Sequence, residues 1–226
     1  MNISDFQFFR QLSTAEELSL SESTKRFEFS RDQTIIAKGT CINHVYFIVS
    51  GRVKDTATTR SGKEIVFNTL TAGDCFGIVS PSSTKEAQSD FIALEETEVY
   101  AVCVNEFIRL MRANATVSES VIAEITRMAY NFSNKLYEIR ALDVSARTWA
   151  ELLRHAANDP RDTESDYIEI KNLPTHEEIA NTIFTHREAV TREISKLRKD
   201  GIIFKTEQNQ LVANVGLLEK MVTDYS

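Results

Sequence analysis

The sequence predicts an α+β fold: first a small antiparallel β-barrel or sandwich, then one long helix, and last a winged helix-turn-helix. Five of the seven glycines separate short apolar segments between residues 39 and 77, a pattern typical of strands joined by tight turns. Residues 105–142 contain neither glycine nor proline and are predicted to be helical. Two helical patterns and a hairpin pattern follow within 175–213. We therefore expect three parts, 1–104, 105–142 and 143–226.

The composition is typical of a soluble globular chain. Of its 226 residues, 42% are hydrophobic and 26% are charged, and the formal net charge is −7. No window approaches the roughly 18 uncharged apolar residues that a membrane span needs, so no membrane partner is expected. The first residues, MNISDFQFFRQLSTAEELSL, lack the basic start and long apolar run of a signal peptide. The sequence therefore predicts a cytoplasmic location.

Three cysteines, Cys41, Cys75 and Cys103, lie far apart and form no CxxC pair. An odd count with this spacing argues against a disulfide framework and against a zinc or iron–sulfur site. No metal ligands are therefore expected, and the simplest interpretation is three buried or half-buried thiols.

The N-terminal third is predicted to hold a short helical lead-in and then the strands. Ser13 or Thr14 can cap a helix at AEELSL. From about Phe27 to Val104 the chain carries short segments rich in β-branched and aromatic residues, which favours an antiparallel barrel or sandwich. The clearest strand candidates are VYFIV (45–49), EIVFNTL (64–70), FIAL (91–94) and VYAVCV (99–104).

The long helical segment, in which a break is expected near Asn114, carries a heptad seam. Apolar or small residues alternate at spacings of four and three from Ser118 onward, which is the a/d repeat of a coiled coil. Such a stripe can also pack on its own domain, but its strict alternation and polar flanks such as Glu124 favour a homodimer. The predicted dimer seam is Ile122, Ile125, Ala129, Phe132, Leu136 and Ile139.

The C-terminal part begins with a predicted helix and a predicted strand. VSARTWAELLRHAAN (144–158) has a helical pattern, which Pro160 ends. A polar loop follows, and YIEIK (167–171) alternates as a short strand does.

Two helices joined by a tight turn come next, and two capping boxes predict where they begin. Thr175 with Glu178 caps the first helix, and Thr185 with Glu188 caps the second. The predicted core faces are Ile179 and Ile183 on the first helix, and Val190, Ile194 and Leu197 on the second.

The end of the second helix and the segment after it complete the motif. Asp200 and Gly201 stop the helix, and IIFK (202–205) and QLVA (210–213) then predict a hairpin. Two helices followed by a hairpin are typical of a winged helix-turn-helix.

The second helix carries the residues that could read DNA. Arg187 and Glu188 lie in its first exposed turn, and Arg192 lies one turn on from Glu188. In a helix-turn-helix this end of the helix enters the major groove. There an Arg can bind O6 and N7 of guanine, and a Glu can accept from the N4 amino group of cytosine. The expected phosphate contacts are Thr175, His186, Thr191, Lys196 and Lys199.

The charge of this segment is opposite in sign to that of the chain. Residues 185–205 hold six basic and three acidic groups, a local net of +3, although the pI is near 5.3. A polyanion meets the local patch rather than the average charge. An amphipathic surface helix with ordinary charges is the simpler alternative, but the capping boxes and the hairpin favour a helix that reads double-stranded DNA.

Several motifs resemble those of one family. THREAVTREISKL (185–197), with its R-E-x-V-x-R core, and LDVSARTWAELL (142–153) are similar to the recognition helix and the interdomain joint of the CRP/FNR superfamily of bacterial transcription regulators. HVYFIVSGRVK (44–54), GKEIVFNTL (62–70) and AGDCFG (72–77) resemble its cyclic-nucleotide-binding-type β-roll. The resemblance covers almost the whole chain. It implies a homodimer that binds a palindrome of TGTGA-like half-sites, with RNA polymerase as a further partner.

The effector pocket implied by this resemblance departs from the cyclic-nucleotide pattern. Ile78 stands where cyclic-nucleotide binders carry the Glu that holds the ribose, and Gln88 replaces the Arg that pairs with the phosphate. A cyclic phosphate buried without a cation is strongly disfavoured, and Phe132 cannot hydrogen-bond adenine as the family's polar pair does. We therefore predict poor or no binding of cAMP. The pocket positions are Gly77, Ile78, Gln88, Ser89, Phe132 and Ser133.

Other sensors of the family can be compared in the same way. An iron–sulfur sensor needs an N-terminal cysteine cluster, which is missing, and a haem sensor needs an axial ligand, for which His44 and Cys75 are weak candidates. No cofactor is expected. Two interpretations remain. In one, a less charged small-molecule effector binds near the polar stretch SPSST (80–84); in the other, no ligand acts and the protein level sets activity.

Two other functional classes fit parts of the sequence. A β-roll resembles a cupin barrel, but cupin chemistry needs clustered His and Glu ligands, and His44 is the one histidine in the barrel region. No Ser/His/Asp set, P-loop or GxGxxG motif appears, so no enzyme activity is expected. The second class is a regulator or scaffold whose C-terminal domain binds protein instead of DNA. Loss of DNA binding on mutation of Arg192 would argue against that class.

Overall fold

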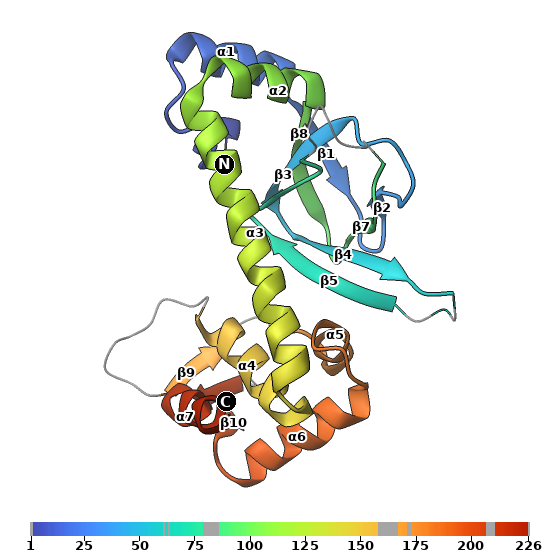
Figure 1. Cartoon of the computed structure of the whole chain (residues 1–226), viewed down its shortest axis with the longest axis vertical. Helices are drawn as coiled ribbons and strands as arrows, with labels where there is room; N and C mark the ends of the chain where they lie inside the picture. The colour runs from blue at the N-terminus through green and yellow to red at the C-terminus, as the bar shows by residue number, and fades with distance from the viewer. Residues whose placement is uncertain are drawn as a thin grey trace. The chain divides into compact units, whose positions relative to one another are not determined.

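A computed structural model describes residues 2–60, 62, 64–78, 86–157, 167–170, 173–206 and 211–225 (Figure 1). Contacts divide the chain into two compact units, Met1–Ala129 and Tyr130–Ser226. The division falls inside one long helix, Ala115–Ala141, which therefore contributes residues to both units. Within the described residues, no helix is long and apolar enough to cross a membrane.

The first unit is the predicted β-roll with helices on either side of it in the sequence. The elements are η1 (Ile3–Asp5), α1 (Thr14–Ser23), β1 (Lys25–Phe29), β2 (Thr34–Ile36), β3 (His44–Ser50), β4 (Arg52–Thr58), β5 (Glu64–Thr71), β6 (Cys75–Phe76), β7 (Asp90–Ala93), β8 (Thr97–Cys103), α2 (Val104–Ala113) and α3 (Ala115–Ala141). The strands form two antiparallel sheets, in the orders β1-β8-β3-β6 and β2-β7-β4-β5 (Figure 1). β3, β5, β7 and β8 confirm the four strand candidates.

The N-terminal lead-in forms part of the core of this unit. Phe6, Phe8 and Phe9 are at most 2% exposed. Their rings pack on Phe47 of β3 and Phe107 of α2, with centroids 5.1 to 6.5 Å apart. Such aromatic pairs contribute about 0.5–1.5 kcal/mol each beyond the area that they bury. The segment therefore anchors the roll, a role that its helical reading alone did not predict.

The predicted cap of α1 is confirmed. The Ser13 hydroxyl accepts a hydrogen bond from the Glu16 amide at 3.4 Å, and the Glu16 carboxylate accepts one from the Ser13 amide at 2.8 Å. The box satisfies two amides that the start of the helix would otherwise leave without partners.

Two glycines occupy positions that the neighbouring strands close off to any side chain. Gly51 has a φ of 88°, and a Cβ there would lie 2.5 Å from Thr97 Oγ1. Gly77 has a φ of 79°, and its Cβ would lie 2.7 Å from the carbonyl oxygen of His44. Only glycine adopts this backbone region at no steric cost. Both turns therefore require glycine.

Two of the three cysteines are more exposed than predicted. Cys75 in β6 is buried, and burial together with the carboxylates of Glu124 and Asp74 raises the pKa of its thiol. Cys41 and Cys103 are exposed, so the prediction of buried or half-buried thiols is wrong for these two. Cys41 precedes β3, and Cys103 is the last residue of β8 and the N-cap of α2, where the buried pattern of the strand ends.

α2 and α3 are separated at Asn114, where the break was predicted. The Asn114 side chain accepts hydrogen bonds from the amides of Thr116 at 3.0 Å and Val117 at 3.3 Å. It thereby caps the start of α3, as Asn commonly does. The face of α3 that packs on its own unit includes Val117, Val121 and Glu124. Glu124 is only 3% exposed, so its expected place on a solvated flank is wrong.

The large residues of the predicted seam lie on a different face of α3 and are exposed. Ile122 is 62%, Phe132 is 53% and Leu136 is 59% exposed, and Ile125 and Ile139 are exposed as well. The alternative that this stripe packs on its own domain is therefore wrong for the described residues. Large apolar side chains in a row are costly to leave in water and usually mark an interaction surface.

The second unit contains the last turns of α3 and the elements that follow. These are α4 (Val144–Ala157), β9 (Tyr167–Ile170), α5 (His176–Thr182), α6 (Arg187–Lys199), β10 (Ile203–Lys205), β11 (Leu211–Asn214) and α7 (Val215–Tyr225). β11 pairs with both β10 and β9, so the predicted hairpin becomes a three-stranded antiparallel sheet (Figure 1). The two helices and the hairpin confirm the predicted winged helix-turn-helix. α7 was not predicted; its signal was Asn214, whose side chain accepts from the Leu217 amide at 2.9 Å.

An ion-pair network joins α3 to α4 within the second unit. Arg154 on α4 lies 2.6 Å from Glu138 of α3 and 2.5 Å from Glu151. Burial alone would raise the pKa of Glu151, but hydrogen bonds and charge from His155 and Arg154 lower it to about 2. Glu151 therefore stays ionised near neutral pH, and the network holds the last turns of α3 against α4.

Candidate nucleic-acid interface

The first helix of the motif begins as predicted. Thr175 Oγ1 accepts from the Glu178 amide at 3.2 Å, and the Glu178 carboxylate accepts from the Thr175 amide at 2.6 Å. Ile179 and Ile183 are buried in the core of the second unit. The capping box fixes the start of α5, and the buried isoleucines fix the face that it turns inward.

The turn between α5 and α6 is held by backbone hydrogen bonds. Phe184 has a φ of 56°, an uncommon conformation for a bulky residue. The Thr185 amide donates to the carbonyl of Ala180 at 2.8 Å, and the Ile183 amide donates to the carbonyl of Ile179 at 2.9 Å. These bonds end α5 and keep Thr185 in the turn.

The second predicted capping box is wrong. α6 begins at Arg187, its N-cap is His186, and no side chain caps it. With His186 at the N-cap, the third helical position is Ala189, which has no carboxylate to complete a box. Because Thr185 is held in the turn, Glu188 does not fold back onto the backbone and stays exposed.

The three predicted base-reading residues share the exposed side of α6. Arg187, Glu188 and Arg192 are all exposed, and within the described part of the chain none of them has an ion-pair partner. Glu188 and Arg192 are one turn apart and so lie on the same face. The opposite face buries Val190, Ile194 and Leu197, as predicted. The reading side is therefore free to contact a ligand.

The five predicted phosphate contacts lie on the same two helices and are exposed as well. Thr191 is partly engaged already, because its hydroxyl donates to the carbonyl of Arg187 at 2.9 Å. The same oxygen lies 2.9 Å from Nδ1 of His176 on α5, so it accepts from that ring nitrogen. Thr191 thus ties α5 to α6. The exposed set is Thr175, His186, Thr191, Lys196 and Lys199.

His176 is a functional-site neighbour that the sequence reasoning missed. Burial lowers the pKa of its imidazole, and the charges of Arg198 and Arg187 lower it further. The two arginines place His176 within the positive field of α6. Its signal in the sequence was its place directly after the N-cap, at the end of α5 that faces α6.

The lowered pKa of His176 predicts a loss of stability in mild acid. The unfolded chain takes up a proton at the ordinary imidazole pKa of about 6.5, whereas the folded chain does so only at lower pH. The stabilising contribution is complete above that value and falls as the pH drops towards the folded pKa. We expect His176→Gln to reduce the shift of the urea midpoint between pH 7.5 and 5.5. His186→Gln is the control. If the midpoint of His176→Gln shifted as much with pH as that of the control, the prediction would be wrong.

The predicted effector residues belong to different parts of the structure. Gly77 and Ile78 follow β6, and Ser89 is buried just before β7. Gln88 is exposed, and its side chain donates to the carbonyl of Glu86 at 3.1 Å. Phe132 and Ser133 are exposed on the part of α3 that belongs to the second unit. The stretch SPSST (80–84) lies outside the described residues.

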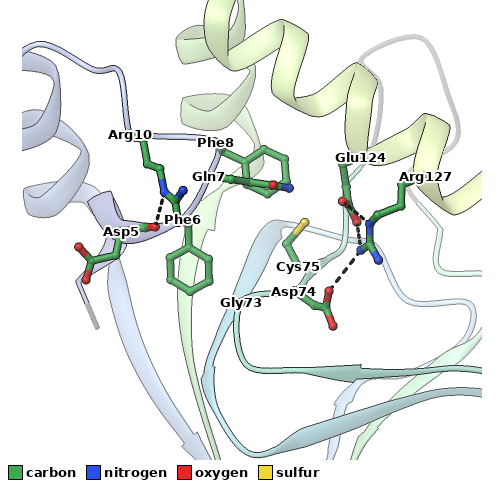
Figure 2. A pocket seen from close by; sticks show the side chains of 10 residues that line it. All are labelled: Asp5, Phe6, Gln7, Phe8, Arg10, Gly73, Asp74, Cys75, Glu124 and Arg127. Carbon is green, nitrogen blue, oxygen red and sulfur yellow. Dashed lines mark hydrogen bonds and ion pairs between the residues drawn. The ribbon is translucent and has the colours of Figure 1, made fainter. Parts of the chain in front are cut away.

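A cavity of about 240 Å³ in the first unit is lined by none of these residues (Figure 2). Figure 2 shows Arg127 of α3 between Glu124 and Asp74, at 2.6 Å and 3.2 Å respectively. These contacts compensate the buried carboxylate of Glu124 and link α3 to the turn before β6. The lining is completed by the N-terminal segment and the β5–β6 turn, with Asp5, Phe6, Gln7, Phe8, Arg10, Gly73 and Cys75.

Two family models match the chain: the cyclic nucleotide-binding domain over residues 26–114 and the Crp-like helix-turn-helix domain over residues 146–221. The chain belongs to the CRP/FNR family. It is a DNA-binding transcription regulator, and members of this family are not enzymes. The first model covers the two sheets and α2, and the second covers the helix-turn-helix, the wing and part of α7.

Curated relatives and solved structures agree with this assignment. The regulator is 25% identical over 177 residues to the cAMP-activated global transcriptional regulator CRP of Haemophilus influenzae, which is 78% of each chain. It is similar in fold to FixK2 from Bradyrhizobium japonicum, with a TM-score of 0.76 and 18% identity over 87% of this chain and 96% of FixK2. A CooA mutant from Carboxydothermus hydrogenoformans gives a TM-score of 0.77 and 18% identity over 94% and 91% of the two chains.

Proposed function

We propose that this CRP/FNR regulator binds a palindrome of TGTGA-like half-sites as a homodimer, with α6 in the major groove. The observation that supports it best is the exposed side of α6, where Arg187, Glu188 and Arg192 stand without ion-pair partners among the described residues. Two arginines and one glutamate in this arrangement suit two guanines and one cytosine. The lysines of α6 and its N-terminal amides suit phosphate.

The seam of α3 supports the homodimer. Ile122, Phe132 and Leu136 are each more than half exposed, and a second copy of the same helix would cover them in the a/d pattern of a coiled coil. A two-fold axis along this seam would present two copies of α6 to one duplex. Half-sites in such complexes lie roughly 34 Å apart, one turn of B-DNA.

Direct binding tests this function. The purified protein, without added ligand, is titrated into a labelled duplex with two TGTGA-type half-sites, and into a scrambled duplex, at several salt concentrations. Tight binding with a preference for the palindrome is the expected result. Equal affinity for both duplexes would overturn the reading proposal and favour a C-terminal unit that binds protein. Preference that appears only after a small molecule is added would support an effector-gated regulator.

We further propose that cAMP is not the effector. Ile78 packs against the apolar core of the roll, and Gln88 offers no charge to a cyclic phosphate. Isothermal titration calorimetry with cAMP should show little or no binding. Gln88→Arg is the matched variant, because it adds the missing cation at an exposed position and should strengthen any residual affinity. Wild-type affinity equal to that of cAMP receptors would contradict the proposal.

We propose the location, the further partner and the absence of a cofactor on the same basis. The regulator would act in the cytoplasm, where its DNA lies, with RNA polymerase as a partner and without a metal or haem. Within the described residues, no group of three or more His, Cys, Asp or Glu side chains could hold a metal ion.

A further inference from the structure

A buried carboxylate lies directly behind the reading side of α6. Glu193 follows Arg192 in the sequence, but its side chain points to the opposite, buried face and is 7% exposed. By charge alone it is one of the acidic residues that offset the basic segment. A carboxylate removed from water is costly unless its oxygens receive hydrogen bonds, so the partners of Glu193 decide its role.

Both oxygens of Glu193 are bound by α4. Trp149 Nε1 donates to Oε1 at 2.7 Å, and Ser145 Oγ donates to Oε2 at 2.8 Å. Trp149 is the single tryptophan of the chain and is itself 7% exposed. No cation forms an ion pair with Glu193 in the part of the chain that the structure describes. The carboxylate is thus held by two directional hydrogen bonds to one neighbouring helix.

Hydrogen bonds can fix the rotation of a helix about its axis, which apolar packing alone leaves adjustable. Val190, Ile194 and Leu197 hold α6 on the core, but hydrophobic burial is non-directional and tolerates small rotations of the helix. At an outer radius of about 5–6 Å, a rotation of about 10° moves a side chain by about 1 Å. A bidentate contact to guanine needs donor–acceptor distances near 2.7–3.2 Å, so such a rotation would disrupt it.

We propose that Glu193 is a positioning residue for base recognition. Its bonds to Trp149 and Ser145 set the rotation of α6 against α4, so that Arg187, Glu188 and Arg192 meet the base edges in register. This inference rests on the proposed function of α6. Phosphate contacts tolerate small displacements because they depend mainly on charge. Loss of these two hydrogen bonds should therefore reduce sequence specificity more than it reduces non-specific affinity.

Three variants separate the effect of the hydrogen bonds of Glu193 from the effect of its negative charge. Glu193→Gln keeps an acceptor for Trp149 and offers an amide to the Ser145 hydroxyl, so both bonds can persist. Glu193→Met has similar length but no acceptor. Trp149→Phe removes the donor from the other side and keeps an aromatic ring. If Glu193 and Trp149 act through one contact, the double variant Glu193→Met/Trp149→Phe should lose little more than either single variant.

The experiment is titration of each variant, as the full-length chain, into the palindromic and the scrambled duplex, with thermal unfolding followed by circular dichroism. We expect Glu193→Met and Trp149→Phe to lower the ratio of specific to non-specific affinity by about tenfold, the scale of one net hydrogen bond. Affinity for the scrambled duplex should stay within about threefold on the same scale. Glu193→Gln should keep the wild-type ratio.

The possible outcomes are distinguishable. A purely structural role would lower the unfolding temperature and the active fraction, and so both affinities equally, without changing the ratio. A wild-type ratio in Glu193→Met, or an equal loss in Glu193→Gln, would overturn the inference and leave the proposed function intact. A wild type that does not distinguish the two duplexes would overturn the proposed function and the positioning role with it.

Discussion

Replacing Leu136 by glutamate should give a monomer that no longer binds the palindrome tightly. Leu136 occupies an a position of the seam and is 59% exposed in the single chain. Two copies of the variant would bring two carboxylates together in an apolar interface, and burying unpaired like charges is strongly unfavourable. Sedimentation velocity or light scattering at micromolar protein should show the change from dimer to monomer.

DNA binding should fall with the dimer. Two linked reading heads bind the second half-site at high effective concentration, which raises affinity by about 10²–10⁴. The monomer of Leu136→Glu should therefore bind the palindrome at least about 100-fold more weakly than the wild type. It should bind a single half-site about as well as the wild type does.

Tyr137→Glu is the matched control for this change. Tyr137 is 57% exposed on the same helix, next to Leu136 in the sequence, but it lies outside the a/d pattern. This variant should stay dimeric and keep the wild-type affinity. If both variants, or neither, became monomeric, the seam would not be the dimer interface.

Replacing Arg192 by alanine should remove base recognition without unfolding the motif. Arg192 is exposed, and no described residue forms an ion pair with it, so its loss breaks no contact of that kind within the chain. A bidentate contact to guanine is worth about 1–3 kcal/mol, which corresponds to about 5- to 150-fold in affinity for each half-site. The palindrome meets two copies of Arg192, so the dimer should lose about 2–6 kcal/mol, which is at least about 30-fold in affinity. The variant should also tolerate substitution of the guanine that the wild type requires, as a panel of single-base-pair changes would show.

Lys199→Ala provides the comparison. Lys199 is exposed in the last turn of the same helix and is predicted to contact phosphate. Its loss should weaken binding to every duplex alike. It should also reduce the slope of log affinity against log salt concentration by about one for each copy of Lys199, or about two for the dimer. If Arg192→Ala instead behaved like Lys199→Ala, Arg192 would be a phosphate contact, and the half-site would be read by other residues.

The sequence by itself determined most of the long elements, although it did not predict α7. Glycine spacing and β-branched segments predicted the strands of the roll, and the capping residues at Ser13, Asn114 and Thr175 predicted where helices begin or break. Each of these signals acts through the backbone of a few neighbouring residues. The exposed and buried positions of the R-E-x-V-x-R pattern could also be predicted, because the 3.6-residue turn of a helix separates one face from the other.

Other features became visible only in the tertiary structure, because they depend on contacts between residues far apart in the chain. The N-terminal phenylalanines pack on Phe47 and Phe107, and Arg127, which holds Glu124, also pairs with Asp74 of the β5–β6 turn. The predicted box at Thr185 failed for a local reason that the sequence did not show, because the Thr185 amide donates to the carbonyl of Ala180 in the turn. Glu193 reads as an ordinary surface charge until α4 brings Trp149 and Ser145 against it. Local sequence sets the period of a helix, but only packing decides what the buried face of that helix contacts.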